Sequence, residues 1–268
     1  MSAPATETWV LLRGLTRERR HWGGFVAALQ AARPAARIVA PDLPGNGARR
    51  GEASPRRVEA MTEALRAALH ADGAAPPYRL LALSLGAMVA VDWATRHPHE
   101  LAGAALINTS LRPYSPFWQR LRPRAWTALL RIALATDPRA RESAVLALTA
   151  AQPTDAGALL DEWAAWRRSH PVTRANALRQ LVAAARYRAP AAAPPVPLLL
   201  LAGARDALVD PRCSRRLAAA WRLPLAEHPH AGHDLPLDDA AWVIARLRDW
   251  PAAAPQSPPA SPATGPRP

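Results

Sequence analysis

Short apolar runs alternate with amphipathic segments over the first 110 residues of the chain. Four of the apolar runs have the length of buried strands: 9–12, 38–40, 80–83 and 104–107. Between them, apolar residues recur at helical spacing in 25–32 and in 58–71. Parallel strands that are joined by helices become buried on both faces. The alternation therefore predicts an α/β fold with a mostly parallel sheet and helices on both of its faces.

This alternation stops at residue 111 and resumes at residue 191. The intervening stretch predicts four helices, at 124–135, 139–150, 156–169 and 173–187. Beyond it the pattern again predicts strands and helices in turn, at 197–202, 214–221, 225–228 and 240–250. We therefore expect a core formed by 1–110 and 191–250, with an all-helical insertion at 111–190. Such an insertion is either a cap over an active site or a pair of helical hairpins that forms a dimer.

The insertion is rich in tryptophan, and the segment that follows the core is rich in proline. At helical spacing, Trp118, Trp126, Trp163 and Trp166 either pack between helices or line an apolar substrate pocket, and we expect packing. Residues 251–268 consist mainly of Pro, Ala and Ser without an aliphatic anchor. Such a composition does not offset the entropy of ordering, so this segment predicts a disordered tail.

Length, cysteine content and hydropathy limit the class of protein further. A chain of 268 residues is long enough to bury a core without disulfides or a structural metal. The single cysteine, Cys213, has no internal partner, which favours a reducing cytoplasmic location. The longest apolar run, 196–202, contains Pro197 and is far too short to cross a bilayer, so we expect no membrane span.

A formal net charge of +13 raises the question of nucleic-acid binding. All 34 basic residues are arginines, and they are scattered along the chain without interleaved aromatic residues. The arrangement matches neither a single-strand binding platform nor a DNA-reading module, so we do not expect a nucleic-acid partner. A basic surface would still attract an acidic protein or an anionic substrate.

The segment YRLLALSLGAMVAVDW, residues 78–93, predicts a strand, a sharp turn with Ser84 at its tip, and a helix. A helix packed so closely behind a strand requires small residues beside the serine, and Ala82 and Gly86 occupy those positions. The turn exposes the Ser84 hydroxyl and places the next backbone N–H at a helix N-terminus. The alternative interpretation is a serine that caps the helix.

A serine nucleophile requires a histidine base that is oriented by a carboxylate. Asp206 follows the strand at 197–202 through a glycine turn, and His233 follows the short strand at 225–228, where Gly232 would permit a tight turn. Asp210 is an alternative acid, and Asp206 would then cap the following helix. Although His228 and His230 lie near His233, no second group at ligand spacing indicates a zinc site.

The strand-serine-helix turn and the order Ser84, Asp206, His233 resemble the α/β-hydrolases, with Ala82 in place of the first glycine of their G-x-S-x-G motif. The resemblance covers most of 9–250. The predicted layout is similar to small bacterial carboxylesterases with a helical cap, of the pimeloyl-ACP methyl ester esterase kind. The resemblance to the α/β-hydrolases implies an oxyanion hole formed by the backbone N–H groups of Leu15 and Leu85.

One departure from the family pattern is Arg13, at a position where histidine is usual. Because the donors of the oxyanion hole are backbone groups, the hole itself should persist. The Arg13 guanidinium either lies near the hole and favours anionic substrates, or it points to solvent or pairs with Asp42. We expect the second arrangement.

The resemblance implies acyl transfer through an acyl-enzyme, with no metal and no cofactor. The first hypothesis is hydrolysis of a small-molecule or acyl-chain ester beneath the insertion. The alternatives are a thioesterase or esterase that acts on substrate bound to an acidic acyl carrier protein, a lyase or C–C hydrolase that uses the same triad, and a non-catalytic binding module. The sequence specifies neither the substrate nor the oligomeric state.

Overall fold

A sheet of six parallel strands forms the centre of the computed structural model, which describes residues 7–151 and 155–250. The strand order is β2-β1-β3-β4-β5-β6. The strands are β1 (Thr8–Leu12), β2 (Arg37–Val39), β3 (Tyr78–Leu83), β4 (Leu101–Ile107), β5 (Leu198–Gly203) and β6 (Leu225–His228). The predicted α/β fold is confirmed, and β3 and β4 begin slightly earlier than their apolar runs.

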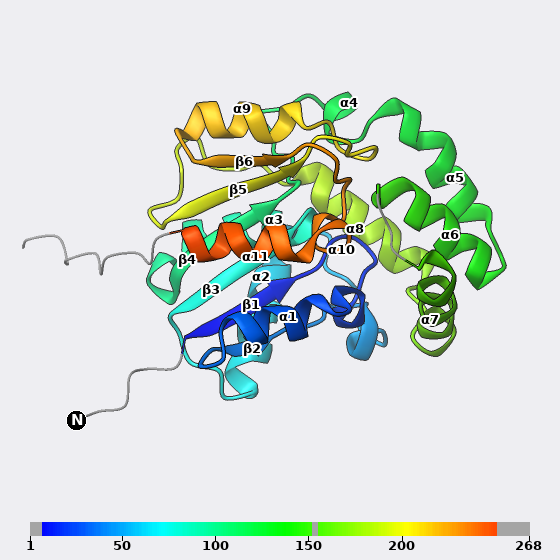
Figure 1. The fold of residues 1–268 in the computed structure, drawn as a ribbon, viewed down its shortest axis with the longest axis horizontal. Coiled ribbons are helices and arrows are strands. Elements are labelled where there is room, and N and C mark those ends of the chain that lie inside the picture. Colours follow the sequence, from blue (N-terminus) through cyan, green and yellow to red (C-terminus); the bar gives the residue numbers. More distant parts are fainter. Residues whose placement is uncertain (1–6, 152–154, 251–268) are drawn as a thin grey trace, which may run out of the picture.

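Side chains of the central strands are buried on both faces of the sheet. In β1, for example, Trp9 and Leu11 belong to one apolar cluster, whereas Val10 and Leu12 belong to the other. Helices α1 (Phe25–Ala32) and α11 (Ala240–Asp249) cover the first face. Helices α2 (Val58–Ala71), α3 (Leu85–Arg96) and α9 (Arg212–Trp221) cover the second (Figure 1). Because helices cover both faces of the sheet, the side chains of the central strands are apolar on both sides, and the strands appear in the sequence as continuous apolar runs.

The helices of the insertion follow β4 and precede β5, and they lie beyond one end of the sheet (Figure 1). They are α5 (Trp126–Leu134), α6 (Pro138–Thr149), α7 (Ala156–Ser169) and α8 (Arg174–Arg186). Two helices of four residues each, α4 (Phe117–Arg120) and α10 (Leu235–Asp238), are too short to produce a periodic pattern and were not predicted. No helix within 7–151 or 155–250 is long and apolar enough to cross a membrane. The predicted tail at 251–268 lies outside the described residues.

Tryptophans of the insertion differ in their environment. Trp163 is buried and packs against Leu146 and Leu160, as expected. Trp118 and Trp126 are instead 53% and 47% exposed, so the expectation of packing is wrong for these two. A helical spacing does not reveal whether a helix presents its apolar face to the core or to solvent.

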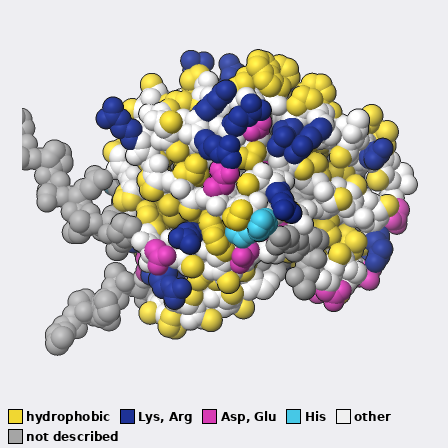
Figure 2. Space-filling view, turned by 45° about the horizontal axis from the view of Figure 1, so that its top comes forward, with side chains coloured by type: hydrophobic (Ala, Val, Ile, Leu, Met, Phe, Trp, Pro, Cys, Tyr) yellow, Lys and Arg dark blue, Asp and Glu magenta, His cyan; other side chains and the backbone are white. Residues whose placement is uncertain are grey.

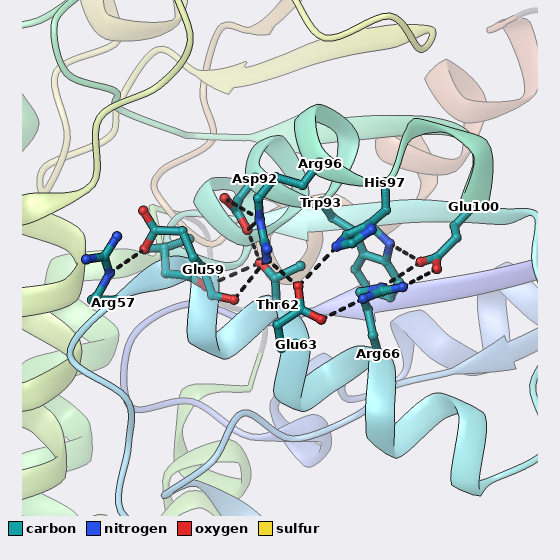
Figure 3. A network of polar contacts seen from close by, with 11 residues as sticks. Arg57, Glu59, Thr62, Glu63, Arg66, Asp92, Trp93, Arg96, His97 and Glu100 are labelled. Atoms are coloured by element: carbon teal, nitrogen blue, oxygen red, sulfur yellow. Dashed lines mark hydrogen bonds and ion pairs between the residues drawn. The ribbon is translucent and has the colours of Figure 1, made fainter.

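A network of charged side chains joins α2 to α3 and to the chain that follows it (Figure 3). Glu63 of α2 is hydrogen-bonded to His97 and Arg66 and also pairs with Arg96. Although burial opposes the shift, these hydrogen bonds lower the pKa of Glu63 to about 2. Exposed ion pairs contribute only about 0–1 kcal/mol each, so we assign this network a role in helix orientation.

The insertion is attached to the core through a buried charged cluster. Arg17, in the loop after β1, donates a 2.6 Å hydrogen bond to Glu142 of α6, and Arg167 of α7 pairs with the same carboxylate. The Arg17 guanidinium also lies over the Trp163 ring, 4.3 Å from its centroid. Because a buried charge is tolerated only when it is paired, this cluster fixes α6 and α7 relative to the loop.

His21 is the neutral member of this cluster. Its Nε2 atom lies 3.0 Å from the Arg17 guanidinium, which can only donate, so the imidazole accepts and must be uncharged. Burial, together with the positive charges of Arg17 and Arg13, holds the pKa of His21 well below its usual value. The ring also makes edge contacts with Trp163 and Trp166.

We therefore predict that the stability contributed by His21 is lost in acid. Below the unfolded-state pKa of about 6.5, the unfolded chain binds a proton at this histidine and the folded chain does not. The stability advantage of the wild type over His21→Gln should shrink by roughly 1.4 kcal/mol per pH unit as the pH falls below that value. Urea unfolding of both proteins across this range measures the difference. An advantage that stays constant or grows in acid would contradict a neutral buried His21.

Candidate active site

Ser84 lies in the turn between β3 and α3. Its backbone adopts φ 57° and ψ −113°, a region that residues other than glycine rarely occupy. Its N–H donates to the carbonyl oxygen of Ile107 at 2.9 Å, and its own carbonyl accepts from the N–H of Ala87 at 3.0 Å. Among the residues described here, the hydroxyl makes no capping hydrogen bond with α3, so the helix-cap interpretation is wrong.

Glycines permit the close approach of the chain around this turn. A Cβ atom at Gly86 would lie 2.5 Å from the carbonyl oxygen of Leu12 and 2.7 Å from that of Arg13. A Cβ atom at Gly14 would lie 3.2 Å from the Cβ atom of Ser84. The first residues of α3 therefore pack directly against the end of β1, as the sequence predicted for Gly86.

Asp206 and His233 meet at the same edge of the sheet, after the neighbouring strands β5 and β6. The His233 Nδ1 atom lies 2.6 Å from the Asp206 Oδ2 atom, and the two side chains are only 5% and 1% exposed. The Asp206 Oδ1 atom accepts from the backbone N–H groups of Leu208 and Val209, both at 2.8 Å. Because the carboxylate only accepts, Nδ1 carries the proton and Nε2 faces away from it.

The alternative acid, Asp210, is engaged elsewhere. Its carboxylate pairs with Arg212, and the two side chains approach to 2.6 Å. His228, which the sequence places near His233, accepts from the N–H groups of His230 and Ala231 and so shapes the loop. Within the described residues, no group of three or more His, Cys, Asp or Glu side chains is placed to hold a metal ion.

A cavity of about 280 Å³ opens beside Ser84. We call it the Ser84 cavity, and its described lining is mainly apolar: Leu15, Ser84, Leu85, Met88, Ser110, Phe117, Arg120, Leu121, Leu129, Leu181, Ala184, Ala185, Leu208 and Val209. Leu15 and Leu85, the predicted oxyanion-hole residues, therefore border the same space as Ser84. Leu85 is the first residue of α3, where backbone N–H groups have no acceptor within the helix. Within the described residues, the Ser84 hydroxyl and the His233 ring are not hydrogen-bonded to each other, and the ring is bonded to Asp206 through Nδ1.

Arg13 neither points to solvent nor pairs with Asp42, and that expectation is wrong. It forms a two-pronged ion pair with Asp234, at 3.1 Å and 2.5 Å, and both side chains are 4% exposed. Its guanidinium also lies over the ring of Trp22. Asp42 instead accepts from the backbone N–H of Arg19. Since Asp234 neutralises Arg13, the structure gives no support to a role for Arg13 in selecting anionic substrates.

Asn108, which directly follows β4, is a buried residue of the site that sequence analysis missed. Its Nδ2 atom donates to the carbonyl oxygens of Gly232 and His233, at 3.0 Å and 2.8 Å. Its Oδ1 atom accepts from the N–H of Gly203 at 2.9 Å. Asn108 thus ties the histidine loop to the end of β5. The available signal was an asparagine immediately after a buried strand, where its positive φ of 47° is tolerated better than for most residues.

The insertion also contacts the loops of the site. The carbonyl oxygen of Thr149, at the end of α6, accepts from the N–H of Asp234 at 2.7 Å. A Cβ atom at Gly232 would lie 2.9 Å from the same oxygen, so a glycine is needed here for space. The backbone of Gly232 does not adopt a positive φ, so its conformation alone does not call for glycine. Gln180 of α8 accepts from the N–H of Thr16, next to Leu15, at 2.8 Å.

A parallel sheet with a strained serine turn after one strand and a buried histidine-aspartate pair after two others defines a hydrolase architecture. Residues 9–246 match the family model of the alpha/beta hydrolase family, and the chain belongs to that family. No curated protein matches the chain closely enough to be counted as a relative.

Solved structures share this fold at low sequence identity. A thermophilic esterase from Thermogutta terrifontis is 22% identical, with 91% of this chain and 89% of that one aligned at a TM-score of 0.67. The esterase RhEst1 from Rhodococcus sp. ECU1013 is 22% identical, with 91% and 90% aligned at a TM-score of 0.68. A hydrolase from Pseudomonas aeruginosa PA01 is 20% identical, with 93% and 91% aligned at a TM-score of 0.67.

We predict that Asn108→Asp destabilises the protein by at least about 2 kcal/mol. The aspartate retains the size of the side chain and the acceptor for Gly203, but it removes both hydrogen bonds to the histidine loop and places a carboxylate against two carbonyl oxygens. Chemical unfolding near neutral pH measures the loss. A change below about 0.5 kcal/mol would show that these hydrogen bonds do not hold the loop.

Proposed function

We propose that this protein is a serine hydrolase that cleaves carboxylic esters through Ser84, His233 and Asp206. The observation that carries the proposal is the buried 2.6 Å hydrogen bond between Asp206 and His233, at the sheet edge where Ser84 occupies a strained turn. A strained serine turn or a buried histidine-aspartate pair can each occur without catalysis, but their combination is the arrangement that activates a serine hydroxyl.

In the first step, Ser84 Oγ attacks the ester carbonyl carbon while His233 Nε2 accepts the hydroxyl proton. Asp206 holds the Nδ1–H tautomer and stabilises the imidazolium that forms. The hydrogen bond between nucleophile and base often tightens only when substrate is bound, so its absence from the free protein is compatible with this step.

The carbonyl oxygen gains negative charge as the tetrahedral intermediate forms. Leu15 and Leu85 line the Ser84 cavity, and we assign their backbone N–H groups as the donors that stabilise this oxygen. The N-terminus of α3 adds a favourable electrostatic field at Leu85.

Collapse of this intermediate breaks the bond to the alcohol oxygen, which takes the proton from His233 and leaves. Water then attacks the acyl-enzyme, with His233 as the base. The bond between the carbonyl carbon and Ser84 Oγ breaks, the proton returns to Oγ, and the carboxylic acid is released. Apart from the attacking water, every group that acts in these steps is a side chain or a backbone group of this chain.

The apolar lining of the Ser84 cavity favours an ester with an aliphatic chain. Side chains from the insertion, including Leu129 of α5 and Leu181 of α8, contribute to this lining. We therefore assign residues 111–190 as a cap that contacts the substrate. Two structural neighbours are named as esterases, which supports ester cleavage and leaves the chain of the substrate open.

A second candidate substrate is an acyl group bound to an acidic carrier protein. Arginines gather on the face of the molecule that includes α4 and α9 (Figure 2), where Arg212 and Arg215 of α9 are paired with Asp210 and Glu227. Such a surface would steer an acidic partner toward the Ser84 cavity. The catalytic chemistry would remain the same, with a thioester or ester carbonyl attacked by Ser84.

We predict that hydrolysis of aryl esters depends on all three residues. Ser84→Ala and His233→Ala should each lower kcat by on the order of 10⁴-fold or more, and Asp206→Asn by a similar order. Steady-state kinetics with purified, folded proteins measures these losses. The control is His230→Ala, which removes an exposed imidazole from the same loop and should retain the rate. Equal activity of Ser84→Ala and the wild type would refute the assignment of the nucleophile.

A further inference from the structure

Arg120 is the one charged residue among the described residues that line the Ser84 cavity. It ends the short helix α4, and its neighbours in the lining are mostly leucine and alanine side chains, such as Leu121 and Ala184. A guanidinium in an apolar wall near a reactive serine is costly, because removing a charge from water is unfavourable unless a partner compensates it.

Only some of the N–H donors of this guanidinium form hydrogen bonds with protein groups. Its Nη2 atom donates to the carbonyl oxygen of Ala184 at 2.6 Å. Its Nε atom is buried and has no hydrogen-bond partner. In the part of the chain that the structure describes, Arg120 forms no ion pair. Burial, with a contribution from the nearby positive charge of Arg112, lowers the pKa of Arg120.

Acidic side chains near the cavity already have partners. Asp206 is bonded to His233 and to two backbone N–H groups, and Asp210 is paired with Arg212. Neither carboxylate is among the residues that line the Ser84 cavity.

Two stretches of the sequence that contribute to the cavity contain no acidic residues. No Asp or Glu occurs between Glu100 and Asp137, or between Glu162 and Asp206. These two stretches include α4, α5 and α8, which contribute Phe117, Arg120, Leu129, Leu181, Ala184 and Ala185 to the lining. Arg120 is half-buried, and within the described residues no carboxylate pairs with its guanidinium, so an anion that enters the Ser84 cavity would meet an uncompensated positive charge.

We propose that Arg120 binds an anionic oxygen-acid group, a carboxylate or a phosphate, carried by the ester substrate. The proposal rests on the function proposed above, and it defines the substrate as an ester with a negatively charged end. The apolar lining holds the carbon chain between the two ends, Ser84 attacks the ester carbonyl, and Arg120 provides charge-assisted hydrogen bonds to the anion.

The test compares 4-nitrophenyl esters of straight-chain acids that end in a methyl group, a carboxylate or a phosphate, over a graded series of chain lengths. At the best length, the wild type should prefer an anionic ester over its neutral counterpart in kcat/KM. Arg120→Met should reduce this preference by about ten- to hundredfold, mainly through KM for the anionic ester, because a hydrogen bond to a charged group is lost. The carboxylate and phosphate series identify which anion fits.

Two further variants separate recognition from folding. Arg120→Lys retains the positive charge but lacks the forked N–H donors of a guanidinium, so it should keep part of the preference for the anionic ester. Arg248→Met removes an exposed arginine from α11, which covers the first face of the sheet, and it should leave both rates unchanged. If Arg120→Met slows both esters equally, Arg120 acts only as a support for α8 through Ala184, and the proposal is wrong. A preference that Arg120→Met does not alter would also overturn it.

Binding without turnover distinguishes failure of this proposal from failure of the proposed function. In Ser84→Ala, calorimetry should show tighter binding of the anionic ester than of the neutral one, and adding Arg120→Met should abolish the difference. This result would establish the anion site even if the wild type hydrolysed neither ester. Equal affinities in Ser84→Ala would reject the site independently of catalysis.

Discussion

The close packing of α3 against the end of β1 is the constraint on which the candidate site depends. Because Gly86 has no side chain, the first turn of α3 rests on the carbonyl groups of Leu12 and Arg13. This contact forces Ser84 into its strained backbone conformation and brings the loop after β1 beside it. The positions of the proposed nucleophile and of both proposed oxyanion donors therefore follow from one backbone contact. This contact lies at the point where the strand order reverses, which is where α/β sheets bind ligands.

The insertion contributes to the site in two ways. Its helices line the Ser84 cavity, and its polar groups hold the loops that carry the proposed site residues. Thr149 is hydrogen-bonded to the histidine loop, Gln180 to the loop of Leu15, and Glu142 to Arg17. The same helices therefore contact both the cavity and the loops that carry Leu15 and His233.

The sequence predicted the strands, the long helices and the elbow at Gly86, because each produces a local pattern of a few residues. It also placed Asp206 and His233 in loops that follow strands, and the structure shows that these two strands are neighbours in the sheet. It did not predict the Arg13–Asp234 pair, the bridge made by Asn108 or the unpaired state of Arg120. These features join residues that are distant in the chain, or they depend on which face of a short helix is buried. Contacts between distant residues and the buried face of a short helix produce no periodic pattern in the sequence. The catalytic roles of Ser84, Asp206 and His233 stay predictions.

Covalent labelling shows whether Ser84 is an activated nucleophile. The folded protein would be treated with a fluorophosphonate, and the modified residue would be located by mass spectrometry. We expect a single adduct at Ser84 that forms much more slowly in His233→Ala, because the imidazole no longer removes the hydroxyl proton. An unmodified Ser84 in the folded protein would show that this serine is not activated and would favour a hydrolase fold that serves only as a binding module.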